Sequence, residues 1–104
     1  MATVTASKWY TGTIDENGTV TVTGRGPCYI KLNGDFGGGT VTVNDKAAKS
    51  ELSVVTDEGT DLTFTADGSR VLDYPDFIPM TVQLSLAGAT SPDLDVYVGF
   101  GHSA

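Results

Sequence analysis

The sequence has little of what nucleic-acid-binding proteins and disulfide-rich secreted proteins depend on. Its 104 residues include one cysteine and only six Lys and Arg residues, against thirteen Asp and Glu, for a formal net charge of −7. A nucleic-acid interface needs clustered basic side chains that displace the counterions of the phosphates, and the basic residues here are scattered along the chain. A lone cysteine excludes an intramolecular disulfide and favours folding in a reducing cytoplasm. We therefore expect no nucleic-acid partner.

Long apolar runs are also missing. No segment approaches the length that spans a bilayer, and residues 1–5 have neither the basic nor the apolar region of a secretory signal. We therefore expect a protein that is made in the cytoplasm, without a membrane anchor and without a membrane partner.

The residues most often used in acid–base and nucleophilic catalysis are few and poorly placed. The only histidine, His102, lies in the last residues of the chain, so a catalytic relay would have to be built on a mobile tail. Cys28 follows Pro27 and has no histidine near it to act as a base, which favours an inert, partly buried thiol. We expect no enzymatic activity, no catalytic residue and no cofactor.

Carboxylates are plentiful, and calcium is the metal that oxygen ligands from loops would suit. Two turns each carry several such side chains: Asp57, Glu58 and Asp61 in one, and Ser91, Asp93 and Asp95 in the other. Neither spacing matches the loop of a helix–loop–helix calcium site, and Asp is a common turn former in its own right. Zinc would need nitrogen or sulfur ligands that the chain does not supply. We expect no bound metal.

What the sequence does have is a series of short runs in which apolar and polar residues alternate. Such alternation is typical of strands with one buried face, and Thr, which is abundant here, favours strands. The runs are residues 8–14, 19–23, 28–33, 40–43, 52–56, 61–66, 80–86 and 94–100. They predict an all-β fold, an antiparallel β-sandwich of about eight short strands, jelly-roll or Ig-like, with no significant helix.

The sequence predicts one domain, residues 1–104, with residues 1–8 as an N-terminal arm and residues 101–104 as a short tail. Residues 44–51 form at most one turn of helix. The expected core collects the apolar residues on one face of each strand. These are Ile14, Val20, Val22, Ile30, Leu32, Val41, Val43, Leu52, Val54, Leu62, Phe64, Val82, Leu84, Leu86, Leu94, Val96 and Val98.

Turn residues predict how the first strands are connected. Asn17-Gly18 is the strongest short hairpin signal, so residues 8–14 and 19–23 are expected to pair. Pro27 has no N–H to donate and is expected to break the sheet after residue 23.

The three glycines at 37–39 predict a sharp turn, because glycine readily adopts positive φ. Together with the turn signal Asn33-Gly34, they favour residues 28–33 and 40–43 as neighbouring antiparallel strands of one sheet.

Several motifs follow one another in a recognisable order. A Thr-rich N-terminal hairpin and a Gly-Pro turn precede the run FGGGTVTV of residues 36–43, and the run SLAGATSPDLDV occupies residues 85–96. In this order they resemble a group of small β-sandwich structural proteins encoded by tailed bacteriophages, over most of residues 18–98. Residues 44–51 depart from the pattern of that group.

The resemblance implies a non-enzymatic virion structural protein, foremost a capsid decoration or cement protein that binds the head surface and stabilises the shell. The implied partners are the major capsid protein or other virion proteins, together with further copies of the chain. The implied location is the virion, after synthesis in the cytoplasm of the host cell.

Docking would use residues that the sandwich core does not need. In the N-terminal segment these are Thr3, Val4, Thr5, Trp9 and Tyr10, and in a loop bracketed by prolines they are Phe77 and Ile78. Trp and Tyr are favoured anchors of protein interfaces. Phe77 and Ile78 have an alternative role, which is to cap one open end of the sandwich.

Two other functions stay open. The first is a tail, neck or fibre subunit, or a host-glycan-binding β-module, which predicts an exposed aromatic platform near Tyr74 or Tyr97. The second is an unrelated soluble β-domain or enzyme, which predicts a cleft that brings Asp carboxylates together around a metal.

Overall fold

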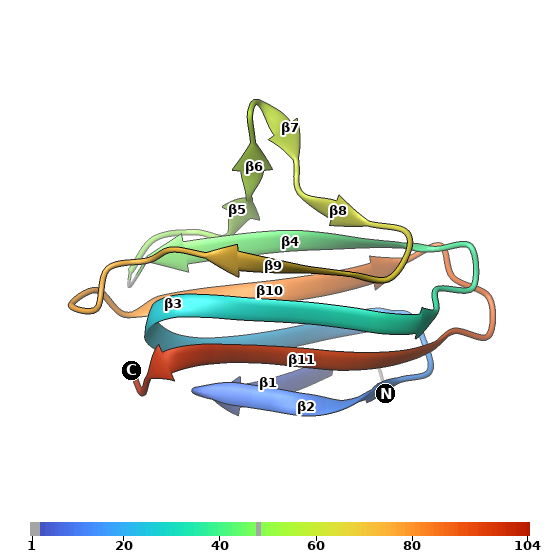
Figure 1. Cartoon of the computed structure of the whole chain (residues 1–104), viewed down its shortest axis with the longest axis horizontal. Helices are drawn as coiled ribbons and strands as arrows, with labels where there is room; N and C mark the ends of the chain where they lie inside the picture. The colour runs from blue at the N-terminus through green and yellow to red at the C-terminus, as the bar shows by residue number, and fades with distance from the viewer. Residues whose placement is uncertain (1–2, 48) are drawn as a thin grey trace.

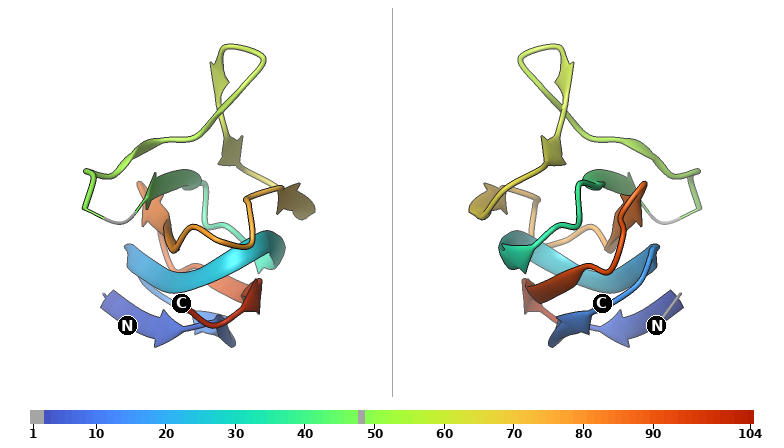
Figure 2. Two further views of the ribbon diagram at one scale, coloured as in Figure 1. Left: turned by 90° about the vertical axis from the view of Figure 1, so that its left-hand side faces the viewer. Right: turned by 90° about the vertical axis from the view of Figure 1, so that its right-hand side faces the viewer.

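The structure, a computed structural model, describes residues 3–47 and 49–104. These residues form two facing layers of β-strands and contain no helix (Figures 1 and 2). The predicted all-β sandwich is confirmed. The part of the chain that the structure describes therefore has no helix that could cross a membrane.

The first layer is built around one long strand and its neighbours. Its strands are, in spatial order, β1 (Thr3–Ser7), the first half of β3 (Gly18–Asp35), β10 (Met80–Ala87) and β4 (Thr40–Ala47), with the short β5 (Ser53–Val54) and β8 (Thr63–Phe64) paired to β4. All neighbours are antiparallel except β1 and β3, which are parallel.

The second layer uses the other half of the same long strand. Its strands are, in spatial order, β2 (Trp9–Ile14), β11 (Asp93–His102), the second half of β3 and β9 (Gly68–Leu72). Because β3 belongs to both layers, it joins them at its bend near Gly26. Between β5 and β8 the chain leaves the sandwich as a projecting hairpin, β6 (Thr56–Asp57) and β7 (Thr60–Asp61), seen at the top of Figure 1.

The core lies between the layers and is entirely apolar among the described residues. Strand alternation sends every second side chain inward, and no polar or charged side chain is buried with them. Burial of each large aliphatic side chain stabilises the fold by about 1.5–3 kcal/mol. Most of the predicted inward residues are indeed buried.

The core prediction is wrong for Leu52 and Val54, which are 41% and 38% exposed, and Phe64 is only partly buried. Val54 pairs with Asn44, an outward-facing residue of β4, so Val55 rather than Val54 turns toward the core. The prediction also missed three buried side chains, those of Cys28, Phe36 and Phe100.

The hairpin predicted at residues 15–18 does not form, because β2 pairs with β11 and β3 pairs elsewhere. Neither Asn17 nor Gly18 has the positive φ that a tight two-residue hairpin turn needs. The Asn17 side chain instead bonds the backbone of Ala89 in both directions, with N···O distances of 3.0 and 2.9 Å. The turn therefore carries the chain from one layer to the other.

The break predicted at Pro27 is also wrong, because β3 runs without interruption from Gly18 to Asp35. Gly26 has a φ of +82° and its N–H bonds Pro75 O, so the strand bends there without ending. Up to Gly24 β3 pairs with β1 and β10, and from Cys28 onward it pairs with β11 and β9, with one further pair between Arg25 and His102 of β11. Pro27 falls at the change of partners, where a missing N–H costs little.

Residues 28–33 and 40–43 are not neighbours, because the first lie in the second layer and the second in the first layer. Gly34 stays inside β3, paired with Leu94. The crossing is made after Asp35, where Gly37 and Gly38 have φ of +61° and +77° and Phe36 is buried. The predicted glycine turn exists, but it changes layers instead of closing a hairpin.

The two ends of the chain are more ordered than the sequence indicated. Residues 3–7 of the expected arm form β1, whose Val4 and Ala6 pack against the core, while residues 1 and 2 lie outside the described residues. At the other end β11 continues through His102, so only Ser103 and Ala104 follow it. The segment 44–47 expected as a helical turn or loop extends β4, since it pairs with β10.

Candidate functional site

The residues predicted to dock lie in different environments. Trp9 is 55% and Phe77 79% exposed, and Thr3 and Thr5 face solvent. Val4, Tyr10 and Ile78 are half-buried, and the first two of these pack against the core. Trp9 and Phe77 are therefore the large apolar side chains of the predicted set that a partner could reach.

Trp9 belongs to a row of residues that crosses the outer face of the second layer. In the strand register Trp9 lies opposite Gly99, Gly99 opposite Tyr29, and Tyr29 opposite Val71. Tyr29 and Val71 are 40% and 57% exposed. We call Trp9, Tyr29, Val71 and the adjacent Tyr97 the aromatic face.

Tyr97 fills the gap that Gly99 leaves in this row. A Cβ at Gly99 would lie 2.7 Å from the Tyr97 hydroxyl oxygen and 3.0 Å from its ring, so the ring lies over the glycine. The Tyr97 ring centroid is then 6.2 Å from that of Trp9 and 5.9 Å from that of Tyr29. The three rings form one continuous surface, with interplanar angles of 54° and 52° between neighbours.

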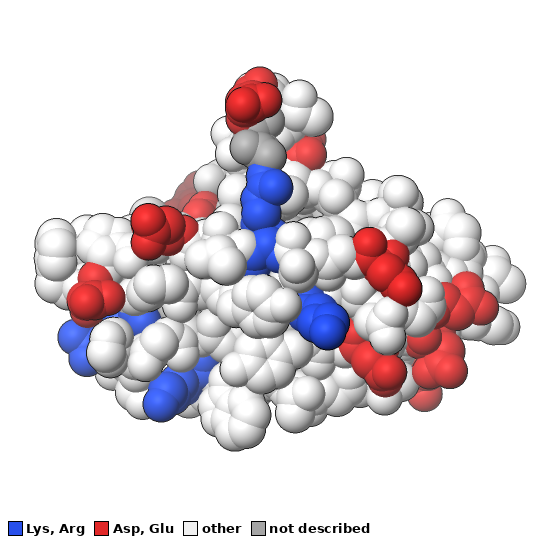
Figure 3. All heavy atoms as spheres, viewed as in Figure 1, with Lys and Arg blue, Asp and Glu red and all other residues white. Residues whose placement is uncertain are grey.

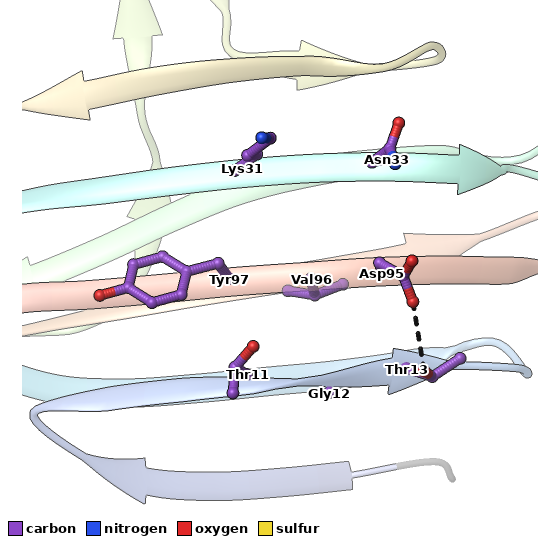
Figure 4. Close-up of a pocket in the computed structure, with 8 residues that line it drawn as sticks. All are labelled: Thr11, Gly12, Thr13, Lys31, Asn33, Asp95, Val96 and Tyr97. Carbon is purple, nitrogen blue, oxygen red and sulfur yellow. Dashed lines mark hydrogen bonds between the residues drawn. The ribbon is translucent and has the colours of Figure 1, made fainter.

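A polar hollow of about 380 Å³ adjoins the aromatic face at Tyr97 (Figure 4). Its floor is the backbone of β11 at Val96, whose side chain points into the core. Tyr97 and Asp95 stand at its two ends, because they flank Val96 on the outer side of the same strand. The residues along its two sides are Thr11 and Thr13 on β2, and Lys31 and Asn33 on β3.

The polar groups of the hollow are largely uncommitted within the protein. The Asp95 carboxylate accepts one long bond, from the Thr13 hydroxyl at 3.4 Å. The Lys31 and Asn33 side chains form no ion pair or hydrogen bond with the residues that the structure describes. A ligand that binds in the hollow would therefore displace only water from these donors and acceptors.

Charge is distributed unevenly around this face. Figure 3 shows it mostly white in the middle, with a few basic side chains, while acidic side chains gather at the right-hand end, where β3 ends and β11 begins. The hollow itself contains one cation, Lys31, and one carboxylate, Asp95. It is close to neutral within a protein of net charge −7.

The two residues considered for catalysis, Cys28 and His102, do not line the hollow. Cys28 is fully buried, and this burial raises the pKa of its thiol to about 12, so the reactive thiolate is strongly disfavoured. His102 is an exposed side chain whose Nε2 lies 3.9 Å from Asp76 Oδ1. The structure does not bring these two side chains together.

Tyr74, one of the two positions where an aromatic platform was expected, is engaged with the protein itself. Its hydroxyl donates to Asp45 Oδ2 at 2.5 Å, and its ring stacks on Phe100 at a centroid distance of 6.3 Å. Burial and the neighbouring Asp45 carboxylate raise the pKa of the phenol. The aromatic surface lies around the other expected position, Tyr97, whose half-buried ring is flanked by the exposed rings of Trp9 and Tyr29.

Those carboxylates weighed as calcium ligands whose side chains the structure describes do not converge on a metal site. Among the described residues no three His, Cys, Asp or Glu side chains lie close enough together to hold a metal ion. The side chain of Asp57 lies outside the described part of the chain.

Sequence reasoning named Trp9 and Tyr97 but missed Tyr29 and the hollow. Alternation alone places Tyr29 on the outer side of its strand, since Cys28 and Ile30 are apolar neighbours. That signal could not show that Tyr29, Tyr97 and Trp9 lie side by side, because they come from strands whose pairing the turns mispredicted.

No protein-family model, curated protein or solved structure matches this chain.

Proposed function

We propose that this protein is a non-catalytic glycan-binding module that holds its ligand on the aromatic face. One observation carries the proposal: the exposed rings of Trp9 and Tyr29 and the half-buried ring of Tyr97 between them are contiguous on one sheet face, beside a hollow lined with hydrogen-bonding groups. Sugar rings have apolar C–H faces that stack on aromatic rings, and hydroxyl edges that need donors and acceptors. The aromatic face and the hollow offer both kinds of contact side by side.

The exposure of these rings is costly for the isolated protein. Placing a large aromatic side chain in water leaves its apolar surface hydrated, and contiguous exposed apolar patches on soluble proteins commonly mark binding sites. The core does not need the side chains of Trp9, Tyr29 and Val71, which are exposed on the outer face. A binding role explains why they lie together on the outside.

The motifs at residues 36–43 and 85–96 lead us to propose a virion as the setting, with the module on a tail, neck or fibre. A glycan-binding face would there attach the particle to the surface of a host cell. The resemblance supports this setting, and the aromatic face around Tyr97 favours this role over one that relies on a free N-terminal arm, because that arm is largely strand β1.

Trp9 is the only tryptophan, so its fluorescence reports directly on the proposed site. We expect that titration with a panel of soluble oligosaccharides changes this fluorescence in a saturable way. Tyr29→Ala should weaken binding about tenfold, since truncating an anchoring aromatic side chain typically costs more than about 1 kcal/mol. Gly99→Ala should also weaken binding, because the added Cβ pushes the Tyr97 ring out of the row.

Gly101→Ala is the matched control for Gly99→Ala. It lies on the same strand, and its added Cβ would come no closer than 3.7 Å to another residue, an ordinary contact. Melting temperatures should be similar for the wild-type protein and all three variants. The proposal is wrong if no oligosaccharide binds, or if binding is unchanged in both Tyr29→Ala and Gly99→Ala.

Capsid decoration remains a second candidate because of one observation, the exposure of Phe77. Its side chain is 79% exposed in the loop between Pro75 and Pro79, which suits insertion into an apolar pocket on a shell. This function predicts that Phe77→Ala weakens attachment to phage heads while the melting temperature stays the same. Gold-labelled antibody would then mark the heads of particles, whereas the glycan-binding role places the label on tails.

A further inference from the structure

We infer that the hollow beside Tyr97 is a subsite for one uncharged sugar ring of a single, soluble glycan chain. This inference rests on the proposed glycan-binding function and specifies its ligand. The hollow is defined by Thr11, Thr13, Lys31, Asn33, Asp95 and Tyr97.

The size of the hollow suits a single ring. The rows Thr11–Tyr97–Lys31 and Thr13–Asp95–Asn33 bound it, and residues two apart on a strand are about 7 Å apart. From β2 to β3 the distance is two strand spacings, roughly 9–10 Å. Its volume of about 380 Å³ lies at the small end of ligand sites, which span roughly 300–1,000 Å³.

The hydrogen-bonding groups of the hollow match hydroxyl groups better than they match ions. Asp95 only accepts, Lys31 only donates, and the Thr hydroxyls and the Asn33 amide can do both. A sugar hydroxyl also donates and accepts, so one ring can satisfy several of these groups at once. For a phosphate or sulfate the attraction of Lys31 is opposed by the repulsion of Asp95, and for a cation the attraction of Asp95 is opposed by the repulsion of Lys31.

The net charge of the whole molecule also favours an uncharged ligand over an acidic one. The hollow contains one cation and one carboxylate, but the protein around it carries a net charge of −7. Acidic glycans therefore approach against a repulsive field, most strongly at low ionic strength. The ligand expected from this balance is a glycan without carboxylate, sulfate or phosphate groups.

The angles between the rings argue for a single chain over a crystalline surface. A flat polysaccharide crystal needs coplanar rings, whereas neighbouring rings here are inclined by 54° and 52°. Inclined rings can follow the twist of one free chain. Tyr97 lies at the junction, where it contacts both the aromatic row and the hollow.

The test compares variants of Asp95 and Asp93, which lie two residues apart on β11 and are both exposed. Asp95 lies in the hollow and Asp93 does not line it, so the two substitutions remove the same charge from different places. Asp95→Ala should weaken binding of neutral gluco-, galacto- or manno-oligosaccharides about tenfold, because it removes a charge-assisted hydrogen bond. Asp93→Ala should leave this affinity within about twofold of wild type.

Asn33→Ala provides a second variant in case Asp95→Ala impairs folding, and it should weaken the same neutral ligands. Sialylated and uronic-acid oligosaccharides of equal length should bind more weakly than the neutral ones at low salt. Microcrystalline cellulose and chitin should not retain the protein from solution.

The possible results separate this inference from the function on which it rests. If Tyr29→Ala weakens binding but Asp95→Ala and Asn33→Ala do not, the aromatic face binds glycans and the hollow is not a subsite. If acidic oligosaccharides bind more tightly than neutral ones, the expected ligand class is wrong. If no oligosaccharide binds in a Tyr29-dependent way, the proposed function itself fails.

Discussion

Cys28 lies on the inner side of β3, opposite Leu72 on β9 and Phe100 on β11. The sequence predicted an inert, partly buried thiol, and the side chain is buried completely. Its environment disfavours the thiolate, which raises the pKa of the thiol from 9.0 to about 12. The same burial links the stability of the protein to pH.

We predict that the free energy of unfolding falls as the pH rises above 9. Between pH 9.0 and about 12 the thiol of the unfolded chain releases its proton while that of the folded chain keeps it. The unfolded state is then favoured by about 1.4 kcal/mol per pH unit. Urea denaturation at pH 8 and pH 10.5 measures this loss.

The control for this prediction is Cys28→Ala, which has no thiol to titrate. Tyr74, whose phenol pKa is also raised, contributes a loss in the same direction and is present in both proteins. The variant is expected to start from a lower stability, because it leaves a small cavity, but to lose less of it between the two pH values. Equal losses in both proteins would show that Cys28 does not carry the effect.

At the scale of strands, sequence patterns predicted well which side chains face the core and predicted poorly which strands pair with each other. Alternation in residues 94–100 correctly placed Leu94, Val96 and Val98 inward, because the direction of a side chain follows from local backbone geometry. Pairing depends on residues distant in the sequence. Asn17 bonds to Ala89, and this contact overrides the local hairpin signal of Asn17-Gly18.

The candidate site could also be predicted only in part, since its arrangement depends on strand pairing. Trp9 and Tyr97 could be named from the sequence as exposed aromatic residues. The hollow could not, since it exists only where β2, β11 and β3 lie in register and place Thr13, Asp95 and Asn33 in one row. That register follows from the unexpected course of β3 through both layers.

The β6–β7 hairpin is expected to be dispensable for folding and for glycan binding. Leu62 N–H donates to Val55 O at 2.8 Å, and both residues bond to Val43, so the hairpin is closed at its base. Beyond that base, β6 and β7 pair with each other and with no other described strand. Replacing residues 56–61 by Asn-Gly should change the free energy of unfolding by no more than about 0.5 kcal/mol.

Chemical denaturation of the shortened protein tests this, and Leu62→Ala is the comparison. Leu62 is buried at the base of the same segment, and its truncation should cost about 2–5 kcal/mol. A loss above about 1 kcal/mol for the shortened protein would mean that the hairpin supports the sandwich.

The whole molecule is small compared with the range over which its charges act. It measures 39 × 28 × 22 Å and carries a net charge of −7. The Debye length is about 30 Å in 10 mM salt and about 8 Å in 150 mM salt. In 10 mM salt each carboxylate is therefore repelled by nearly all the others, whereas in 150 mM salt it is repelled only by those close to it.

Raising the concentration of NaCl from 10 to 150 mM at pH 7 should stabilise the protein by about 0.5 kcal/mol, or roughly 2–4 °C in melting temperature. The reason is that folding brings the acidic side chains closer together than they are in the expanded unfolded chain. Differential scanning calorimetry measures the shift. An unchanged or lower melting temperature would contradict the idea that repulsion between like charges destabilises the fold.

Calcium chloride at matched ionic strength separates screening from binding. Screening alone depends on ionic strength, so the two salts should then give nearly the same melting temperature. A bound ion would add stability that grows with calcium concentration, because binding to the folded state shifts the unfolding equilibrium. Such a rise would overturn the expectation of no metal and would direct attention to the acidic end of the second layer, around Asp35, Asp93 and Asp95.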